Sequence, residues 1–144
     1  MAVGIACVTF LMPIPKIEAN IVEAPSQNAI IAPYLPLGSE IDREVVSRLI
    51  WQELSDIEPS RASFLHERMM KTIECESGFL NIQSNIIQDG IREDSWGLVQ
   101  IHLPSHPYIT KLQALDPEIS IAFMVDNFVG GKANMWSCYK IIYK

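Results

Sequence analysis

One stretch of the sequence, FLHERMMKTIECESGF at residues 64–79, joins an apolar helical pattern to a carboxylate. Its apolar side chains recur at helical spacing and form one stripe, made of Phe64, Leu65, Met69, Met70 and Ile73. Gly78 follows as a residue that can end the helix. Glu76 is therefore predicted at a helix end, half surrounded by apolar side chains, where the pKa of a carboxyl group rises.

A second stretch, SWGLVQI at residues 95–101, places Gly97 21 positions after Glu76. Together, CESGF at 75–79 and SWGLVQI resemble the E-S-G and G-L-M-Q motifs of the lytic transglycosylase and goose-type lysozyme superfamily (SLT-type domain). Members of that family cleave the glycan strands of bacterial cell walls. The resemblance covers roughly residues 60–137, a little over half of the chain. The order and separation of the two motifs are more specific than either motif alone.

The resemblance implies a mainly α, lysozyme-like fold in which Glu76 is the catalytic acid/base. It assigns Ser77 to orienting the glutamate or contacting substrate. Gln100 would lie in the cleft wall beside the acid, although it could instead satisfy buried backbone in a tight hairpin. His102 directly follows the motif and is expected to line the groove. Trp96 could offer a stacking platform for a sugar ring, and it could equally be core.

The late part of the chain departs from the family pattern. Transglycosylases of this family carry an A-Y-N-A-G-type motif whose tyrosine braces the catalytic glutamate, whereas residues 133–139 read ANMWSCY. Tyr139 is the candidate for that bracing and substrate-binding role. Glu74, the acidic neighbour of Glu76, lies two positions earlier on the same helix and is expected to face the other way.

A second carboxylate would decide the mechanism, because hydrolysis needs a base or a nucleophile besides the acid. Asp89 and Asp94 are the aspartates between the motifs, and both lie in a stretch, including Arg92-Glu93-Asp94, that is typical of a solvated loop. A lone acid suits a lytic transglycosylase, in which the muramyl 6-hydroxyl attacks the β-1,4 bond intramolecularly. The alternatives are a hydrolytic lysozyme, a non-catalytic peptidoglycan-binding module, or a specialised wall-associated factor within a secretion or conjugation machine.

Composition limits the partners. The 144 residues, 49% of them hydrophobic, support one globular domain, and the net charge of −6 argues against a nucleic-acid partner. No cofactor is implied. His102 and His106 are four positions apart, but Pro104 between them makes a helical metal pair unfavourable, so no metal site is predicted. We expect a monomer that binds a peptidoglycan strand in a groove.

The N-terminal part is predicted to lie outside the catalytic domain. Residues 1–19 are expected to be an export signal or a short anchor and the only membrane contact, residues 20–38 a proline-rich linker, and residues 39–144 the domain. The protein would then be exported to the periplasm or cell wall. Cleavage removes Cys7 and leaves Cys75 and Cys138, which are expected to form a disulfide, the alternative being two buried thiols.

Helical spacing predicts four helices joined by loops. The first begins after Ser39 as N-cap and ends at Pro59, and the second is the 64–77 stripe. The third starts at Asp116-Pro117 and ends at Gly130-Gly131, and the last spans 133–143. Asp89-Gly90 marks a turn within a small hairpin around residues 82–101. The sequence therefore predicts a mainly α domain with a small hairpin beside the site.

Overall fold

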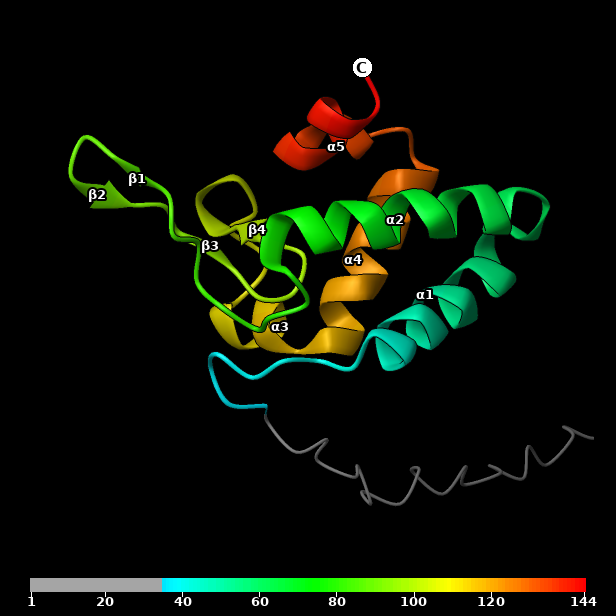
Figure 1. Ribbon diagram of the computed structural model, residues 1–144, viewed down its shortest axis with the longest axis horizontal. Helices are drawn as coiled ribbons and strands as arrows, with labels where there is room; N and C mark the ends of the chain where they lie inside the picture. The colour runs from blue at the N-terminus through cyan, green and yellow to red at the C-terminus, as the bar shows by residue number, and fades with distance from the viewer. Residues whose placement is uncertain (1–34) are drawn as a thin grey trace, which may run out of the picture. The chain divides into compact units, whose positions relative to one another are not determined.

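The computed structural model describes residues 35–144, and the predicted export segment together with residues 20–34 of the predicted linker lies outside them. Within this range the chain is mainly helical, which confirms the mainly α part of the predicted fold class (Figure 1). Its α-helices are α1 (Arg43–Ile57), α2 (Ala62–Ser77), α3 (Lys111–Leu115), α4 (Pro117–Val129) and α5 (Ser137–Ile142). Short 3-10 turns lie at Pro59–Arg61, Leu103–Ser105 and Ala133–Met135.

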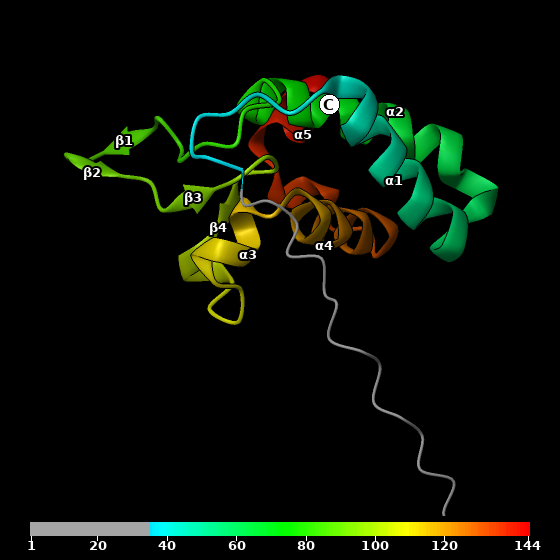
Figure 2. The same cartoon turned by 90° about the horizontal axis from the view of Figure 1, so that it is seen from below.

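The sequence between α2 and α3 forms two antiparallel hairpins rather than the single one predicted. The first pairs β1 (Ile87–Gln88) with β2 (Ile91–Arg92), and the second pairs β3 (Ser95–Trp96) with β4 (Ile101–His102). Both views show the β1–β2 hairpin projecting away from the helices (Figures 1 and 2). The β3–β4 hairpin carries the second sequence motif.

Helix α1 begins at Asp42, whose carboxylate accepts the backbone N–H groups of Glu44 and Val45. The N-cap is therefore Asp42 and not Ser39 as predicted, because the carboxylate of Asp42 lies next to the first free N–H groups of the helix and accepts from them. Val46, Ile50 and Leu54 are fully buried along one face. Helix α1 therefore contributes one apolar face to the core.

Helix α2 buries Leu65, Met69, Met70 and Ile73, as the sequence predicts. Phe64 is the exception, since 54% of it is exposed and its ring lies 4.2 Å from the guanidinium of Arg68. Gly78 ends the helix in the left-handed conformation, with φ of 61°. The carboxylate of Glu76 is thereby placed in the last turn.

Helix α4 packs against α1, α2 and α3. It begins as predicted, with Asp116 as N-cap and Pro117 as the first helical residue. Ile121, Met124 and Val125 have no exposed surface. The sequence missed the five-residue α3 just before it, because so short a helix shows no periodicity.

The end of the predicted linker, residues 35–38, contacts the domain. Leu35 packs against the core, and the N–H of Gly38 donates to the carbonyl of Asn81 at 2.8 Å. Asn81 is fully buried, and its side-chain amide donates to the carbonyl of Leu115 at 2.9 Å. The segment before α1 is thus tied to the loop that follows α2.

Close packing at Gly97 positions the β3–β4 hairpin on α3. Gly97 has φ of +79°, and a Cβ atom added there would lie 1.7 Å from the carbonyl oxygen of Ala114. Gly90, at the tip of the other hairpin, also has φ of +79°, but nothing lies within 4 Å of an added Cβ. Gly97 and Gly90 share the same strained φ, but only Gly97 has a close neighbour. Substituting each one therefore separates the cost of the backbone conformation from the cost of the steric overlap.

We expect Gly97→Ala to lower the free energy of unfolding by about 3 kcal/mol or more, because strain and steric overlap add. Gly90→Ala should cost only about 1 kcal/mol, since the backbone strain acts alone. Urea denaturation of both variants measures the difference. Equal losses in the two variants would show that the contact with Ala114 relaxes freely.

Candidate active site

A cleft of about 390 Å³ lies where the end of α2, the two hairpins and the C-terminal segment meet. Among the residues predicted from the sequence, Glu76, Gln100 and His102 line it. Ser84, Ile86 and Glu93 contribute from the segment between the motifs, and Met135 through Cys138 and Ile141 from the chain end. The cleft thus combines parts of the chain that are far apart in sequence.

Glu76 lies partly buried in this cleft. Its Oε1 atom accepts a hydrogen bond of 2.9 Å from the backbone N–H of Cys138. Burial raises the pKa of the Glu76 carboxyl above its ordinary value; the bond from Cys138 opposes this effect, and the negative charge of Glu93 adds to it. A raised pKa keeps a larger fraction of the group protonated near neutral pH, as proton donation requires.

The disulfide predicted between Cys75 and Cys138 is present, with Cα atoms 5.8 Å apart. It joins the end of α2 to the first turn of α5, so the N–H of Cys138 meets the carboxylate next to Cys75. The indole N–H of Trp136 donates to the carbonyl of Val99 at 2.7 Å and ties the same segment to the second motif. The C-terminal segment is therefore fixed on both motifs.

Ser77 links the two motifs instead of facing the cleft. It is 6% exposed, and its hydroxyl donates to the carbonyl of Leu98 at 2.7 Å. This buried bond crosses from the end of α2 to the β3–β4 turn. Ser77 therefore fixes the end of α2 next to Glu76, and it does not itself line the cleft.

Gln100 combines the two roles that the sequence left open. Its side-chain amide donates to the carbonyls of Gly97 at 2.7 Å and Ile82 at 3.2 Å, which stabilises a turn in which Gln100 itself has φ of 55°. The same residue lines the cleft. His102 also lines the cleft, and its Nδ1 atom forms a hydrogen bond of 2.7 Å with the hydroxyl of Ser105.

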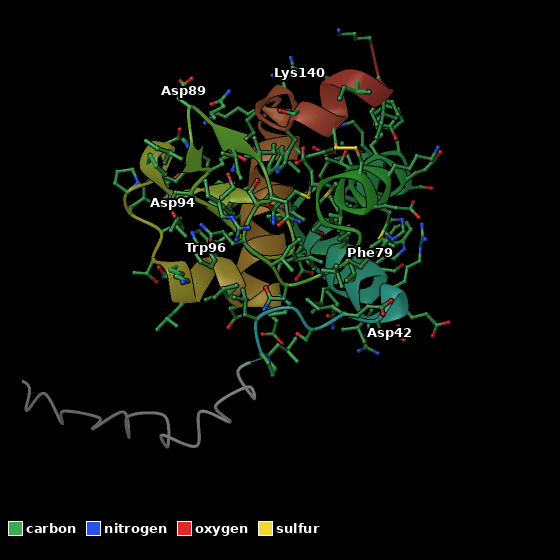
Figure 3. The ribbon with its side chains drawn as sticks, turned by 60° about the vertical axis from the view of Figure 1, so that its left-hand side comes forward. Asp42, Phe79, Asp89, Asp94, Trp96 and Lys140 are labelled. Atoms are coloured by element: carbon green, nitrogen blue, oxygen red, sulfur yellow. A yellow bond between two sulfur atoms is a disulfide. The ribbon has the colours of Figure 1, made fainter. Side chains whose placement is uncertain are left out.

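Two predicted contact residues lie elsewhere. Trp96 is 7% exposed, the ammonium of Lys111 covers its ring at 3.5 Å, and its indole N–H donates to the neighbouring Asp94 (Figure 3). Trp96 is therefore core rather than a sugar platform. The hydroxyl of Tyr139 accepts a hydrogen bond from Arg68 at 2.7 Å, so Tyr139 does not brace Glu76. The backbone N–H of Cys138 makes that contact instead.

Neither of the two aspartates between the motifs lines the cleft, in agreement with their expected place in a solvated loop. Asp89 is exposed at the tip of the β1–β2 hairpin, and Asp94 binds Trp96 (Figure 3). Glu93 lines the cleft, and its Oε2 atom accepts a hydrogen bond from Ser84 at 2.7 Å. The sequence interpretation missed Glu93 by treating residues 92–94 as one solvated cluster, although side chains alternate along extended backbone and only Glu93 of the three is partly buried.

Glu74 faces away from the cleft, as predicted, and pairs with Arg43 at 2.9 Å on the outer surface. Within residues 35–144, no three His, Cys, Asp or Glu side chains are grouped so that they could hold a metal ion. No helix in this range combines the length and the apolar character needed to cross a bilayer.

No family model, curated protein or solved structure matches this chain. The function proposed below therefore rests on the two sequence motifs and on the geometry of the cleft around Glu76.

We expect the double variant Cys75→Ser/Cys138→Ser to lose about 4 kcal/mol of unfolding free energy, because the bridge closes a long loop in the unfolded chain. Urea titration of the oxidised wild type and the double variant measures this loss. A reductant should destabilise the wild type and leave the double variant unchanged. Equal stability of the two oxidised proteins would contradict the prediction.

The raised pKa of Glu76 predicts a pH-dependent gain in stability for Glu76→Gln. A raised pKa in the folded protein means that the neutral carboxyl of Glu76 stabilises the fold relative to the ionised one. This contribution to stability is fully present below the ordinary pKa of Glu, and it is lost as the pH rises through the pKa that Glu76 has in the folded protein. We therefore expect Glu76→Gln to raise Tm at about pH 8 and to leave it unchanged near pH 3. Glu74→Gln is the control, since Arg43 lowers the pKa of Glu74 and its loss should lower Tm at about pH 8. A lower Tm for Glu76→Gln at about pH 8 would contradict the argument.

Proposed function

We propose that this domain cleaves β-1,4-glycosidic bonds of peptidoglycan glycan strands, with Glu76 as general acid. One observation carries the proposal: a carboxyl group with a raised pKa lines a cleft between a helix end and the turn of the second motif. A protonated carboxyl in such a cleft can donate its proton to a glycosidic oxygen as the bond breaks.

The surroundings of Glu76 support a lysozyme-like arrangement as part of this proposal. Helix α2 carries the acid at its end, and the β3–β4 hairpin, which lies near that end (Figure 2), forms part of the cleft wall. Gln100 and His102 on that wall offer hydrogen-bonding groups to sugar hydroxyls. With a net charge of −6 on the chain, recognition of a glycan depends on these directed contacts rather than on bulk charge.

Two routes to cleavage are compatible with one acid. In a lytic transglycosylase, the muramyl 6-hydroxyl attacks C1 and leaves an anhydro-muramyl end, so no water is needed. The sequence favoured the transglycosylase route because it indicated no second carboxylate beside Glu76. Glu93 in the cleft removes that premise and specifically favours the hydrolytic lysozyme route.

The disulfide is compatible with an extracellular or periplasmic location. We propose export to the periplasm or cell wall, where peptidoglycan is the substrate and a monomer suffices for binding. A non-catalytic wall-binding module would keep the same cleft without turnover.

We expect Glu76→Gln to lower wall cleavage at least about a hundredfold, because the amide keeps the shape but cannot donate the proton. Zymography and product release from purified peptidoglycan measure the loss. Glu74→Gln, two residues earlier on the same helix, is the matched control and should retain activity.

Full activity of Glu76→Gln would refute the assignment of the acid. Binding of wall glycan without any cleavage by the wild-type protein would support the binding-module alternative.

A further inference from the structure

We propose that Glu93 is the second catalytic carboxylate of this cleft and takes the proton of an attacking water, which makes the domain a hydrolase. This inference rests on the proposed function and specifies its mechanism. It assigns roles to Glu93 and to the buried Ser84 that supports it.

The carboxylate of Glu93 is held in place rather than free in solvent. Its backbone N–H donates to the carbonyl of Ile86 at 2.9 Å, which anchors the residue at the base of the β1–β2 hairpin. Ser84 is 4% exposed, donates its hydroxyl to Glu93 Oε2 and lies 3.2 Å from the N–H of Ile86, from which it accepts. Both hydrogen-bonding functions of Ser84 thus serve this arrangement, and Ser84 is a positioning residue.

The charges around Glu93 suit a base. Within residues 35–144, no salt bridge neutralises Glu93 or Glu76. Besides Glu93, the titratable groups that line the cleft are Glu76 on α2 and His102 on β4, and the charge of Lys140 on α5 acts on Glu76. His106 lines an adjoining pocket together with Glu93 and His102.

Two carboxyl groups in one cleft can divide acid and base roles between them. Glu76 gives its proton to the glycosidic oxygen as the bond from that oxygen to C1 breaks. The oxygen of a water molecule forms the new bond to C1, and one of its protons passes to Glu93. One water is consumed, the leaving sugar gains a hydroxyl, and solvent returns the transferred proton to Glu76 from Glu93.

The wild-type products test the inference without any variant. In ¹⁸O-labelled water, hydrolysis should place one label at each new reducing end, and that end should appear first as the α-anomer, because water attacks opposite the leaving group. Anhydro-muramyl ends without label would overturn the inference and leave the proposed function intact. A first-formed β-anomer would overturn the role of Glu93 as base for water.

Two variants test whether Glu93, and not another carboxylate of the β1–β2 hairpin region, acts as the base for water. Glu93→Gln should lower release of reducing ends at least about a hundredfold. Asp89→Asn is the matched control, because Asp89 is exposed on the same hairpin and its φ of 51° is one that asparagine adopts readily. Full activity of Glu93→Gln would overturn the inference.

Azide separates catalysis from folding. It needs no base, because it attacks C1 as an anion, so adding azide to Glu93→Ala should restore cleavage and yield a glycosyl azide. A purely structural role for Glu93 predicts no rescue. Absence of cleavage by the wild type would instead overturn the proposed function itself.

Discussion

The hydrogen bond from the backbone N–H of Cys138 to Glu76 is the contact on which the cleft depends. It exists because the disulfide to Cys75 holds the first turn of α5 against the last turn of α2. The same closure covers Glu76 and desolvates its carboxyl. One covalent constraint therefore both buries the acid and supplies a dipole that limits the shift of its pKa.

The second motif reaches the first through buried backbone contacts. Ser77 donates to Leu98, Trp136 donates to Val99, and the absence of a side chain at Gly97 lets the turn approach Ala114. The two hydrogen bonds give partners to polar groups that are buried between the motifs. Gln100 is held in this wall in a left-handed conformation, with φ of 55°.

Glu76 and Glu93 occupy different environments in the same cleft. Glu76 lies at the end of an apolar helical stripe and is raised in pKa mainly by burial, whereas Glu93 accepts a hydrogen bond from Ser84. Such asymmetry is what allows two chemically identical groups to act as acid and base. The negative charge of Glu93 also favours the protonated form of Glu76.

The sequence alone determined the features that depend on local spacing: the helices α1, α2 and α4, the turn at Gly78, and Glu76 at a helix end. Cysteine count added the disulfide. Tertiary structure decided the rest, because contacts between residues distant in sequence follow from packing rather than periodicity. Trp96 is buried, and Tyr139 contacts Arg68 instead of Glu76. The backbone N–H of Cys138 contacts Glu76 in its place, and Glu93 lines the cleft.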